Sequence, residues 1–204
     1  MTTAIIGYGK MGKIYNSLLH SKYIVDILPV SHGMYFNKLE EFIRYGATVD
    51  LAIVATPTTL HFECSKMLLL HGYNVLCEKP ACFSSSDARK LETLAKEKKL
   101  LFYQSTLERY NPVIKYFKKN IALSEIDHIT SYRFGKQPSW DYECDPLYDL
   151  GIHDVDLWFY LTNKKISWKL YCGYGNQRRE ITVYLKRKGK IALDLLNKAV
   201  YIDG

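Results

Sequence analysis

The sequence lacks most of the features that mark membrane-spanning, secreted and metal-binding chains. No apolar run in its 204 residues approaches the roughly 20 residues that cross a bilayer. The five cysteines are odd in number and show no CxxC spacing, which argues against a disulfide framework and against a zinc site. No basic leader or cleavage motif precedes the first apolar segment. We therefore expect a soluble, cytoplasmic protein with reduced thiols and no membrane partner.

A concentrated basic surface is also missing. The net charge is +7, but the lysines and arginines are dispersed over segments such as KYFKKN and YLKRKGK, which are typical of solvated surfaces. No basic helix or nucleic-acid-binding module stands out, so we expect no nucleic-acid partner. The charge is better explained by solubility together with a phosphate-bearing ligand.

Over residues 1–120 the sequence contains a regular alternation of strand-like and helix-like segments. In order, the segments are 3–20 (strand, glycine turn and helix), 22–30 (strand), 39–46 (helix), 48–57 (strand), 59–72 (helix), 74–80 (strand), 84–99 (helix), 100–106 (strand) and 111–120 (helix). The apolar run TVDLAIVATP is typical of a strand that is buried on both faces of a parallel sheet. This alternation predicts an α/β domain with a doubly wound parallel sheet over residues 1–120.

The pattern changes over residues 121–204. Strand-like segments dominate, and apolar and polar residues alternate in REITVYL, as expected of a sheet that is covered on one face only. One mostly apolar helix, YDLGIHDVDLW at residues 148–158, interrupts these segments. We predict a small second domain of the α+β class with an open, mostly antiparallel sheet.

The segment GYGKMG places Gly7, Gly9 and Gly12 in a GxGxxG pattern between the first strand and the first helix. The first two glycines permit a tight turn and the close approach of a pyrophosphate, and the third lets the helix pack closely on the strand. Lys10 and Met11 open the helix, whose N-terminal amides and dipole attract anions. We predict a Rossmann domain that binds NAD or NADP through these five residues. A glycine-rich turn in another kind of α/β protein is the alternative.

The acid that usually follows the second strand of NAD-binding domains is not evident from the sequence. Asp26 falls inside the expected strand, and Ser31 and His32 occupy its expected end. Serine and histidine tolerate a 2′-phosphate better than a carboxylate does. We therefore assign Ser31 and His32 to cofactor binding, and the choice between NAD and NADP stays open.

The helix at residues 148–158 carries Asp149, His153 and Asp156 at spacings of four and three, which places them on one stripe. One interpretation is a surface pair of Asp149 and His153, which would stabilise the helix by only about 0.2–0.5 kcal/mol. A metal site would need further ligands, and no cluster of histidines or carboxylates supplies them, so we expect no metal. The remaining interpretation is a catalytic pair, with Asp156 in a structural role.

Five motifs carry a resemblance to a known family. In order they are GYGKMG, AIVATPTTLH, GYNVLCEKPACF, LERYNP and DLGIHDVD, and they extend from residue 4 to about residue 162. Together they resemble the glucose–fructose oxidoreductase / inositol 2-dehydrogenase (Gfo/Idh/MocA) family. Its members oxidise or reduce a hydroxyl of a sugar or polyol with NAD or NADP. LERYNP is similar to a motif of members that act on nucleotide sugars.

The resemblance implies three catalytic residues. The lysine of the EKP motif lies by the nicotinamide and the substrate in this family, which points to Lys79, and the D-x-x-x-H pair corresponds to Asp149 and His153. Hydride removal from an alcohol carbon requires a base for the hydroxyl proton, and histidine accepts a proton near neutral pH. Asp149 would orient the ring, and Lys79 would stabilise negative charge on the oxygen or share the proton transfer. The base is therefore either Lys79 or His153.

Four further residues carry over on the cofactor side. Thr56, Pro57 and His61 match the TPxxxH stretch that lies beneath the cofactor in this family. Glu78 is assigned to cofactor binding or to local geometry, with a salt bridge at the strand end as the alternative.

On the substrate side, the resemblance assigns Arg109, Asn111 and Tyr148 to substrate contacts. Arg109 has an alternative role in bracing the two domains. Trp140 and Tyr142 join Tyr148 as aromatic residues that either stack on a sugar or base or fill a core.

Two function classes remain. The first is an active NAD(P)-dependent sugar or polyol oxidoreductase, favoured by the presence of all three catalytic residues. The second is a catalytically silent cofactor-binding sensor or regulatory protein, favoured by the missing acid and by a C-terminal region much shorter than in typical family members. A small open sheet exposes a face and an edge unless a partner covers them, so we expect a homo-oligomer, a dimer packed through that sheet.

Overall fold

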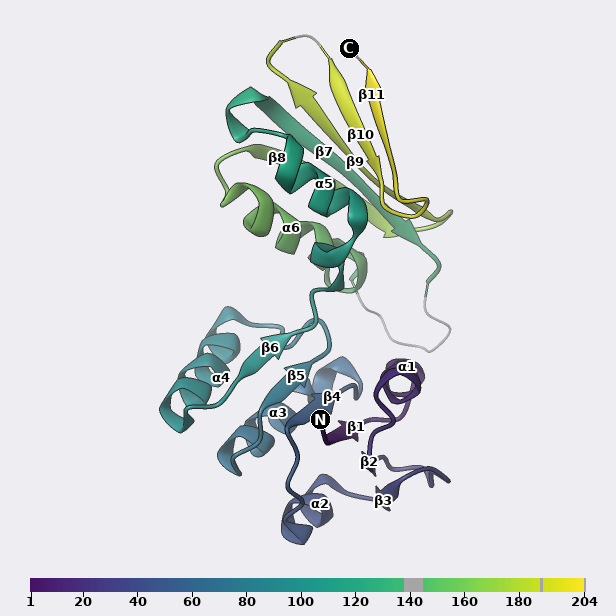
Figure 1. Cartoon of the computed structure of the whole chain (residues 1–204), viewed down its shortest axis with the longest axis vertical. Coiled ribbons are helices and arrows are strands. Elements are labelled where there is room, and N and C mark those ends of the chain that lie inside the picture. Colours follow the sequence, from purple (N-terminus) through teal and green to yellow (C-terminus); the bar gives the residue numbers. More distant parts are fainter. Residues whose placement is uncertain (138–144, 188, 204) are drawn as a thin grey trace. The chain divides into compact units, whose positions relative to one another are not determined.

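The computed structural model describes residues 1–137, 145–187 and 189–203. The chain forms two compact units, Met1–Ser105 (unit 1) and Thr106–Gly204 (unit 2) (Figure 1). Within the described residues, no helix combines the length and the apolar character that a membrane crossing requires. The cysteines of the described part, at positions 64, 77, 82 and 172, are free thiols.

Unit 1 contains a sheet of six parallel strands. They are β1 (Thr3–Ile6), β2 (Tyr23–Val25), β3 (Met34–Phe36), β4 (Leu51–Val54), β5 (Val75–Cys77) and β6 (Phe102–Gln104), in the order β3-β2-β1-β4-β5-β6. The order reverses between β1 and β4, and open α/β sheets bind ligands at the carboxyl ends of their strands at such a reversal. The predicted doubly wound α/β fold is confirmed.

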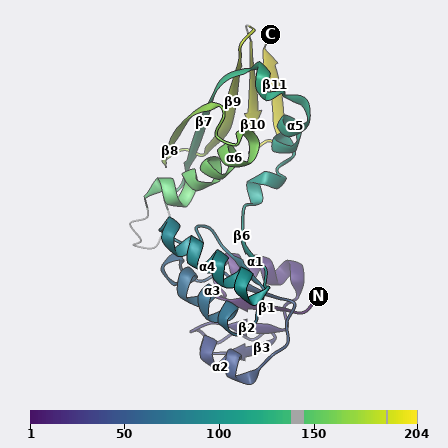
Figure 2. The same cartoon turned by 90° about the vertical axis from the view of Figure 1, so that its left-hand side faces the viewer.

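Helices cover both faces of this sheet. They are α1 (Lys10–Leu19), α2 (Leu39–Tyr45), α3 (His61–Leu70), which follows the short 3-10 turn η1 (Thr58–Leu60), and α4 (Ser85–Lys98). Buried residues of α2, α3 and α4 form one core with alternate residues of the strands, and α3 and α4 lie side by side (Figure 2). On the other face, α1 approaches β1 so closely that a Cβ on Gly12 would lie 3.2 Å from Ile5.

The boundary between the units lies earlier than the sequence predicts. We expected the first domain to end at Asn120, but unit 1 ends at Ser105. The helix α5 (Pro112–Asn120), which follows the 3-10 turn η2 (Leu107–Tyr110), buries Val113, Ile114 and Phe117 in the core of unit 2. A helix that is amphipathic along its length does not reveal from its own sequence which sheet its apolar face meets.

Unit 2 contains a five-stranded sheet. Its strands are β7 (Ile126–Gly135), preceded by the 3-10 turn η3 (Leu123–Glu125), β8 (Ser167–Tyr174), β9 (Arg178–Leu185), β10 (Lys190–Asp194) and β11 (Ala199–Asp203), in the order β11-β10-β9-β7-β8. Only β7 and β8 are parallel, and the other pairs are antiparallel. Helices α5 and α6 (Ile152–Thr162) cover one face (Figure 1). The open, mostly antiparallel sheet is thus confirmed, with two covering helices where the sequence indicated one.

Candidate active site

The residues that follow the strands of unit 1 gather at one edge of its sheet, because all six strands run in the same direction. Main-chain hydrogen bonds join these segments in sequence across the edge: Gly7 N to Val25 O (2.8 Å), Ala55 N to Ile6 O (2.7 Å), Glu78 N to Val54 O (2.9 Å) and Ser105 N to Cys77 O (2.8 Å). The glycine turn, the TPxxxH stretch and the EKP motif therefore share one continuous edge.

The glycine turn has the geometry that a dinucleotide pyrophosphate requires. Gly7 adopts a φ of +93°, and a Cβ there would lie 2.5 Å from the amide nitrogen of Thr56. A Cβ on Gly12 would lie 2.1 Å from the carbonyl oxygen of Gly7, so side chains are excluded at both positions. At Gly9, by contrast, no atom from beyond the neighbouring residues lies within 4 Å of the Cβ position, which leaves open space beside the turn.

The amino end of α1 is available for an anion. Gly9 is its N-cap, and a glycine has no side chain that could cap the first amides. The first amides of a helix, here those of Lys10, Met11 and Gly12, have no acceptor within the helix. Because these amides border the open space at Gly9, the turn fits the phosphates of NAD or NADP.

The acid at the end of the second strand is present, contrary to the sequence analysis. β2 ends at Val25, and the first residue beyond it is Asp26. Its Oδ2 accepts a hydrogen bond from the Tyr8 amide in the glycine turn at 2.5 Å, and its Oδ1 accepts one from the Leu28 amide at 2.8 Å. The apolar Ile27 and Leu28 suggested a longer strand, but they are 83% and 68% exposed.

Ser31 and His32 do not lie at the end of β2, so the position on which their assignment rested is wrong. They precede β3, and the Met34 amide bonds the carbonyl of Lys22, which precedes β2. Both residues are therefore near the amino ends of the two strands, at the edge opposite the glycine turn. His32 lines a surface hollow of about 400 Å³ beside α1.

His61, the first residue of α3, links two of the loops at the carboxyl edge. Its side chain is 2% exposed, with Nε2 2.9 Å from the carbonyl oxygen of Thr56 and Nδ1 2.8 Å from that of Pro80. Carbonyl oxygens only accept hydrogen bonds, so a ring nitrogen that carries a hydrogen donates to the carbonyl beside it. Pro57, the residue after Thr56, is exposed.

The EKP motif directly follows β5. The Glu78 carboxylate is buried, and it accepts hydrogen bonds from the Tyr15 hydroxyl at 2.5 Å and from the Lys79 amide at 3.2 Å. These contacts give Glu78 a role in local geometry, which was one of the two predicted roles. Lys79 itself is half-buried at the same edge.

In unit 2, the helix at residues 148–158 is two elements. A π-helical turn, η4 (Leu147–Gly151), carries Tyr148 and Asp149, and α6 carries His153. Such turns occur frequently at functional sites. The Tyr174 hydroxyl of β8 donates to Asp149 Oδ2 at 3.5 Å, Asp149 and His153 are both half-buried, and Tyr148 is 40% exposed.

Arg109 and Asn111 have structural contacts inside unit 2. The Arg109 guanidinium makes two hydrogen bonds to Asp156 on α6, at 2.5 and 2.8 Å, and stacks over the Tyr160 ring. Asn111 caps α5 by accepting from the Val113 amide at 3.2 Å, and its amide group donates to the carbonyl of Leu195 at 3.0 Å. These bonds give both residues contacts within unit 2, whereas the sequence analysis had assigned them to substrate. They also give Asp156 the structural role that we expected.

A buried ion pair beneath α6 was missed by the sequence analysis. Arg133 on β7 is 1% exposed and pairs with Asp154 on α6, which is 2% exposed. The second nitrogen of the guanidinium lies 3.0 Å from Glu108 in η2. Burial opposes the charge on Arg133, but the two carboxylates outweigh this effect and raise its pKa. One arginine thus joins three elements of unit 2.

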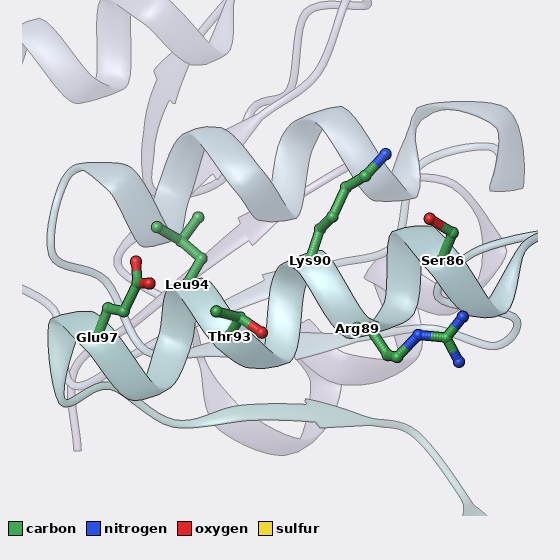
Figure 3. A pocket seen from close by; sticks show the side chains of 6 residues that line it. All are labelled: Ser86, Arg89, Lys90, Thr93, Leu94 and Glu97. Carbon is green, nitrogen blue, oxygen red and sulfur yellow. The ribbon is translucent and has the colours of Figure 1, made fainter.

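Two of the predicted aromatic residues cannot be placed. Trp140 and Tyr142 lie outside the described residues. Among those that are described, no three histidine, cysteine or acidic side chains are placed to hold a metal ion. A hollow of about 410 Å³ is lined only by side chains that project from α4, as Figure 3 shows, and none of them is a predicted site residue.

Comparison with known proteins agrees with this geometry. The model of an oxidoreductase family with an NAD-binding Rossmann fold, GFO_IDH_MocA, matches residues 1–106, about half of the chain. The chain belongs to this family. The match covers the glycine turn, Asp26 and the EKP motif, so the predicted family and the nicotinamide-cofactor fold are both confirmed.

Relatives within and near this family include sugar dehydrogenases. D-xylose 1-dehydrogenase (NADP(+)) of Hypocrea jecorina is 41% identical over an alignment of 119 residues, and the match covers 50% of this chain and 30% of that protein. The structure of UDP-N-acetylglucosamine 3-dehydrogenase from Acidithiobacillus ferrooxidans matches 99% of this chain and 79% of its own, with a TM-score of 0.85 and 19% identity. That of the WlbA dehydrogenase from Bordetella pertussis, in complex with NADH and UDP-GlcNAcA, matches 95% of this chain and 73% of its own, with a TM-score of 0.79 and 17% identity. The chain spans 49%, 30% and 37% of the lengths of three curated relatives, so it matches only part of each.

Proposed function

We propose that this Gfo/Idh/MocA protein transfers a hydride between a nicotinamide cofactor and a hydroxyl or keto carbon of a sugar. The observation that carries the proposal is the carboxyl edge of unit 1. There the glycine turn, Asp26 and Lys79 follow β1, β2 and β5 of one parallel sheet. An edge of this composition combines an anion site, a ribose-binding acid and a cationic side chain, the groups that dinucleotide-dependent hydride transfer uses.

The proposed roles follow from the chemistry of the reaction. When bound, the nicotinamide supplies the hydride acceptor or donor. The resemblance to the family assigns to Lys79 a hydrogen bond to the reacting oxygen and to His153 the exchange of the hydroxyl proton. Asp149 orients the imidazole and favours its protonated form. Tyr148 contacts the sugar.

We infer that Asp26 gives a preference for NAD over NADP. Each carboxylate oxygen has a further lone pair beyond its bond to a backbone amide, so the side chain retains acceptors for the two ribose hydroxyls. A 2′-phosphate in the same place would bring like charges together. The sequence analysis had favoured a catalytically silent sensor because no acid was evident after the second strand. Asp26 follows β2, so this argument for the sensor no longer holds.

The substrate class is proposed from the relatives and from LERYNP. Relatives named for D-xylose and for UDP-N-acetylglucosamine support a sugar, and the motif supports a sugar that carries a nucleotide. The dispersed excess of positive charge, +7 over the chain, is compatible with a diphosphate-bearing substrate.

The test begins with a titration of the purified protein with NADH and NADPH, followed by nicotinamide fluorescence at two salt concentrations. We expect NADH to bind more tightly. A screen of sugars and nucleotide sugars for cofactor oxidation or reduction then follows, with Lys79→Ala and His153→Ala lowering kcat at least about 100-fold. The exposed Lys66→Ala of α3 serves as a control that retains activity. No binding of either cofactor at near-millimolar concentration would refute the proposal, and binding without turnover of any sugar would favour the sensor.

We also propose a homodimer packed through the uncovered face of the unit 2 sheet. Strand register places Tyr132, Tyr171 and Thr182 on that face, opposite α5 and α6. The Tyr132 and Tyr171 rings stack with centroids 5.2 Å apart, and Tyr171 is 50% exposed. The charged residues of the face are balanced in sign: Lys169, Arg178, Lys190, Glu180, Asp194 and Asp203. A balanced, aromatic face suits a two-fold interface, in which the same surface meets itself.

A further inference from the structure

The turn that carries Lys79 is held on its N-terminal side by α1. Glu78 bridges the two: its Oε1 accepts from the Tyr15 hydroxyl at 2.5 Å, and its Oε2 accepts from the Lys79 amide at 3.2 Å. The Tyr15 hydroxyl also lies 3.0 Å from Ser105 Oγ, after β6. Burial, and then the hydrogen bond to Glu78, raises the pKa of Tyr15, so its phenol remains a donor over the ordinary pH range. A buried carboxylate that bonds both a tyrosine and the next main-chain amide fixes the direction of that amide.

On the C-terminal side, the same turn is held by α3. His61 contacts the carbonyl of Pro80 through Nδ1, and the next amide, that of Ala81, donates to the Gln104 side chain at 2.9 Å. The other nitrogen of His61 contacts the carbonyl of Thr56. The residues on either side of Lys79 are therefore held by helices: Glu78 by Tyr15 of α1, and Pro80 by His61 of α3.

Both helices begin in segments that the proposed function assigns to the cofactor. α1 starts at the glycine turn, with Tyr15 five residues beyond Lys10 and on the same rigid element. α3 starts at His61, directly after Thr56, Pro57 and the η1 turn. A dinucleotide that orders the amino end of α1 and the loop after β4 therefore acts on the two contacts that flank Lys79.

We propose that Tyr15 and His61 are positioning residues that couple dinucleotide binding to the placement of Lys79. Tyr15 acts through Glu78, and His61 acts through the carbonyls of Thr56 and Pro80. The inference rests on the proposed function, because it assumes that Lys79 serves the bound cofactor. If the two residues are purely structural, the expectation differs. Replacing them would destabilise unit 1 and would change the affinity for the cofactor by the same factor with and without Lys79.

A double-mutant cycle on NADH affinity separates these cases, with Kd measured by fluorescence for wild type, Tyr15→Phe, Lys79→Met and the double variant. We expect Tyr15→Phe to weaken binding about fivefold in the wild-type background and less than about twofold beside Lys79→Met. His61→Gln, which retains only part of the bridge, should follow the same pattern. Tyr73→Phe is the matched control, because Tyr73 is another buried tyrosine of unit 1, 8% exposed, and it packs on Phe42. Its effect should be the same in both backgrounds.

Melting temperatures of all variants verify that they fold. If Tyr15→Phe does not fold, Ser105→Ala replaces it, because this substitution removes the second contact of the Tyr15 hydroxyl. Additive effects in the cycle would overturn the coupling while leaving cofactor binding intact. A wild-type protein that binds neither NADH nor NADPH would overturn the proposed function and, with it, this inference. Once a sugar substrate is identified, Tyr15→Phe should lower kcat and leave the KM for the sugar unchanged. A general destabilisation of unit 1 would not separate the two constants in this way.

Discussion

Asp26 is the single residue with the clearest consequence for cofactor choice, because its carboxylate lies at the end of β2 and bonds the glycine turn. We predict that Asp26→Ser weakens NADH binding about tenfold and narrows the preference over NADPH, since the substitution removes both a ribose acceptor and a charge that repels a 2′-phosphate. Competitive fluorescence titration of the two cofactors measures both effects.

Asp50→Ser is the control for this substitution. Asp50 also accepts a main-chain hydrogen bond, from the Thr2 amide at 2.6 Å, but it precedes β4 and so lies at the opposite edge of the sheet. Its loss should leave the ratio of the two affinities unchanged. A wild type that prefers NADPH, or an Asp26→Ser variant with an unaltered ratio, would contradict the role of Asp26.

The residues of the candidate site differ in how far the sequence reveals them. The glycine turn is a local pattern, and its spacing predicts its place between the first strand and the first helix. The EKP motif was found through the family resemblance, and the predicted strand 74–80 included it although β5 ends at Cys77. Asp26 was misplaced because the apolar residues after it extended the expected strand. Tyr15 carries no local signal at all, since its partner Glu78 is 63 residues away and the two meet only through the parallel order of the strands.

Among the elements, the buried ion pair makes α6 dependent on β7. Removing one partner of a buried pair leaves an uncompensated charge, which typically costs about 3–5 kcal/mol. We predict that Asp154→Asn lowers the free energy of unfolding of unit 2 by about 3 kcal/mol, because Arg133 retains only Glu108. All three tryptophans lie beyond residue 106, so urea unfolding followed by tryptophan fluorescence reports on unit 2 and not on unit 1.

Asp156→Asn, two residues along the same helix, is the matched control. Its partner Arg109 has a side chain that is 38% exposed, so loss of this pair should cost about 1 kcal/mol or less. Equal losses of unfolding free energy in the two variants would show that the burial of Arg133 does not increase the contribution of its ion pair to stability.

The helices predicted at residues 39–46 and 111–120 agree well with α2 and α5, because local residues decide where these helices begin and end. Gly46 ends α2 with a φ of +68°, and Asn111 with Pro112 begins α5, as their positions in the sequence indicate. The three-residue strand β3 was missed, because Met34–Phe36 is a strand only through its pairing with β2. The buried Arg133 was missed for a related reason: an arginine within a strand reads as solvent-exposed until its acidic partners from two other elements are known.

At the scale of the whole molecule, the sequence predicts two folding units but not where they divide. The apolar face of α5 has the same periodicity whichever sheet it covers, and only the packing of Val113 and Phe117 against unit 2 decides the boundary. The open face of the second sheet, in contrast, follows directly from the alternation of residues in β9. It leads to a prediction about assembly.

We predict that the 23.7 kDa chain behaves as a dimer in light scattering after gel filtration. Tyr171→Glu should weaken the dimer at least about tenfold, because a two-fold interface would place two new carboxylates near each other among stacked aromatic rings. Tyr103→Glu, at a tyrosine of β6 that is 61% exposed in unit 1, should leave the dimer intact. A monomeric wild type would exclude the proposed interface outright. A dimer that tolerates Tyr171→Glu but not Tyr103→Glu would instead assign the interface to the exposed edge strand of unit 1, where unpaired main-chain groups also favour association.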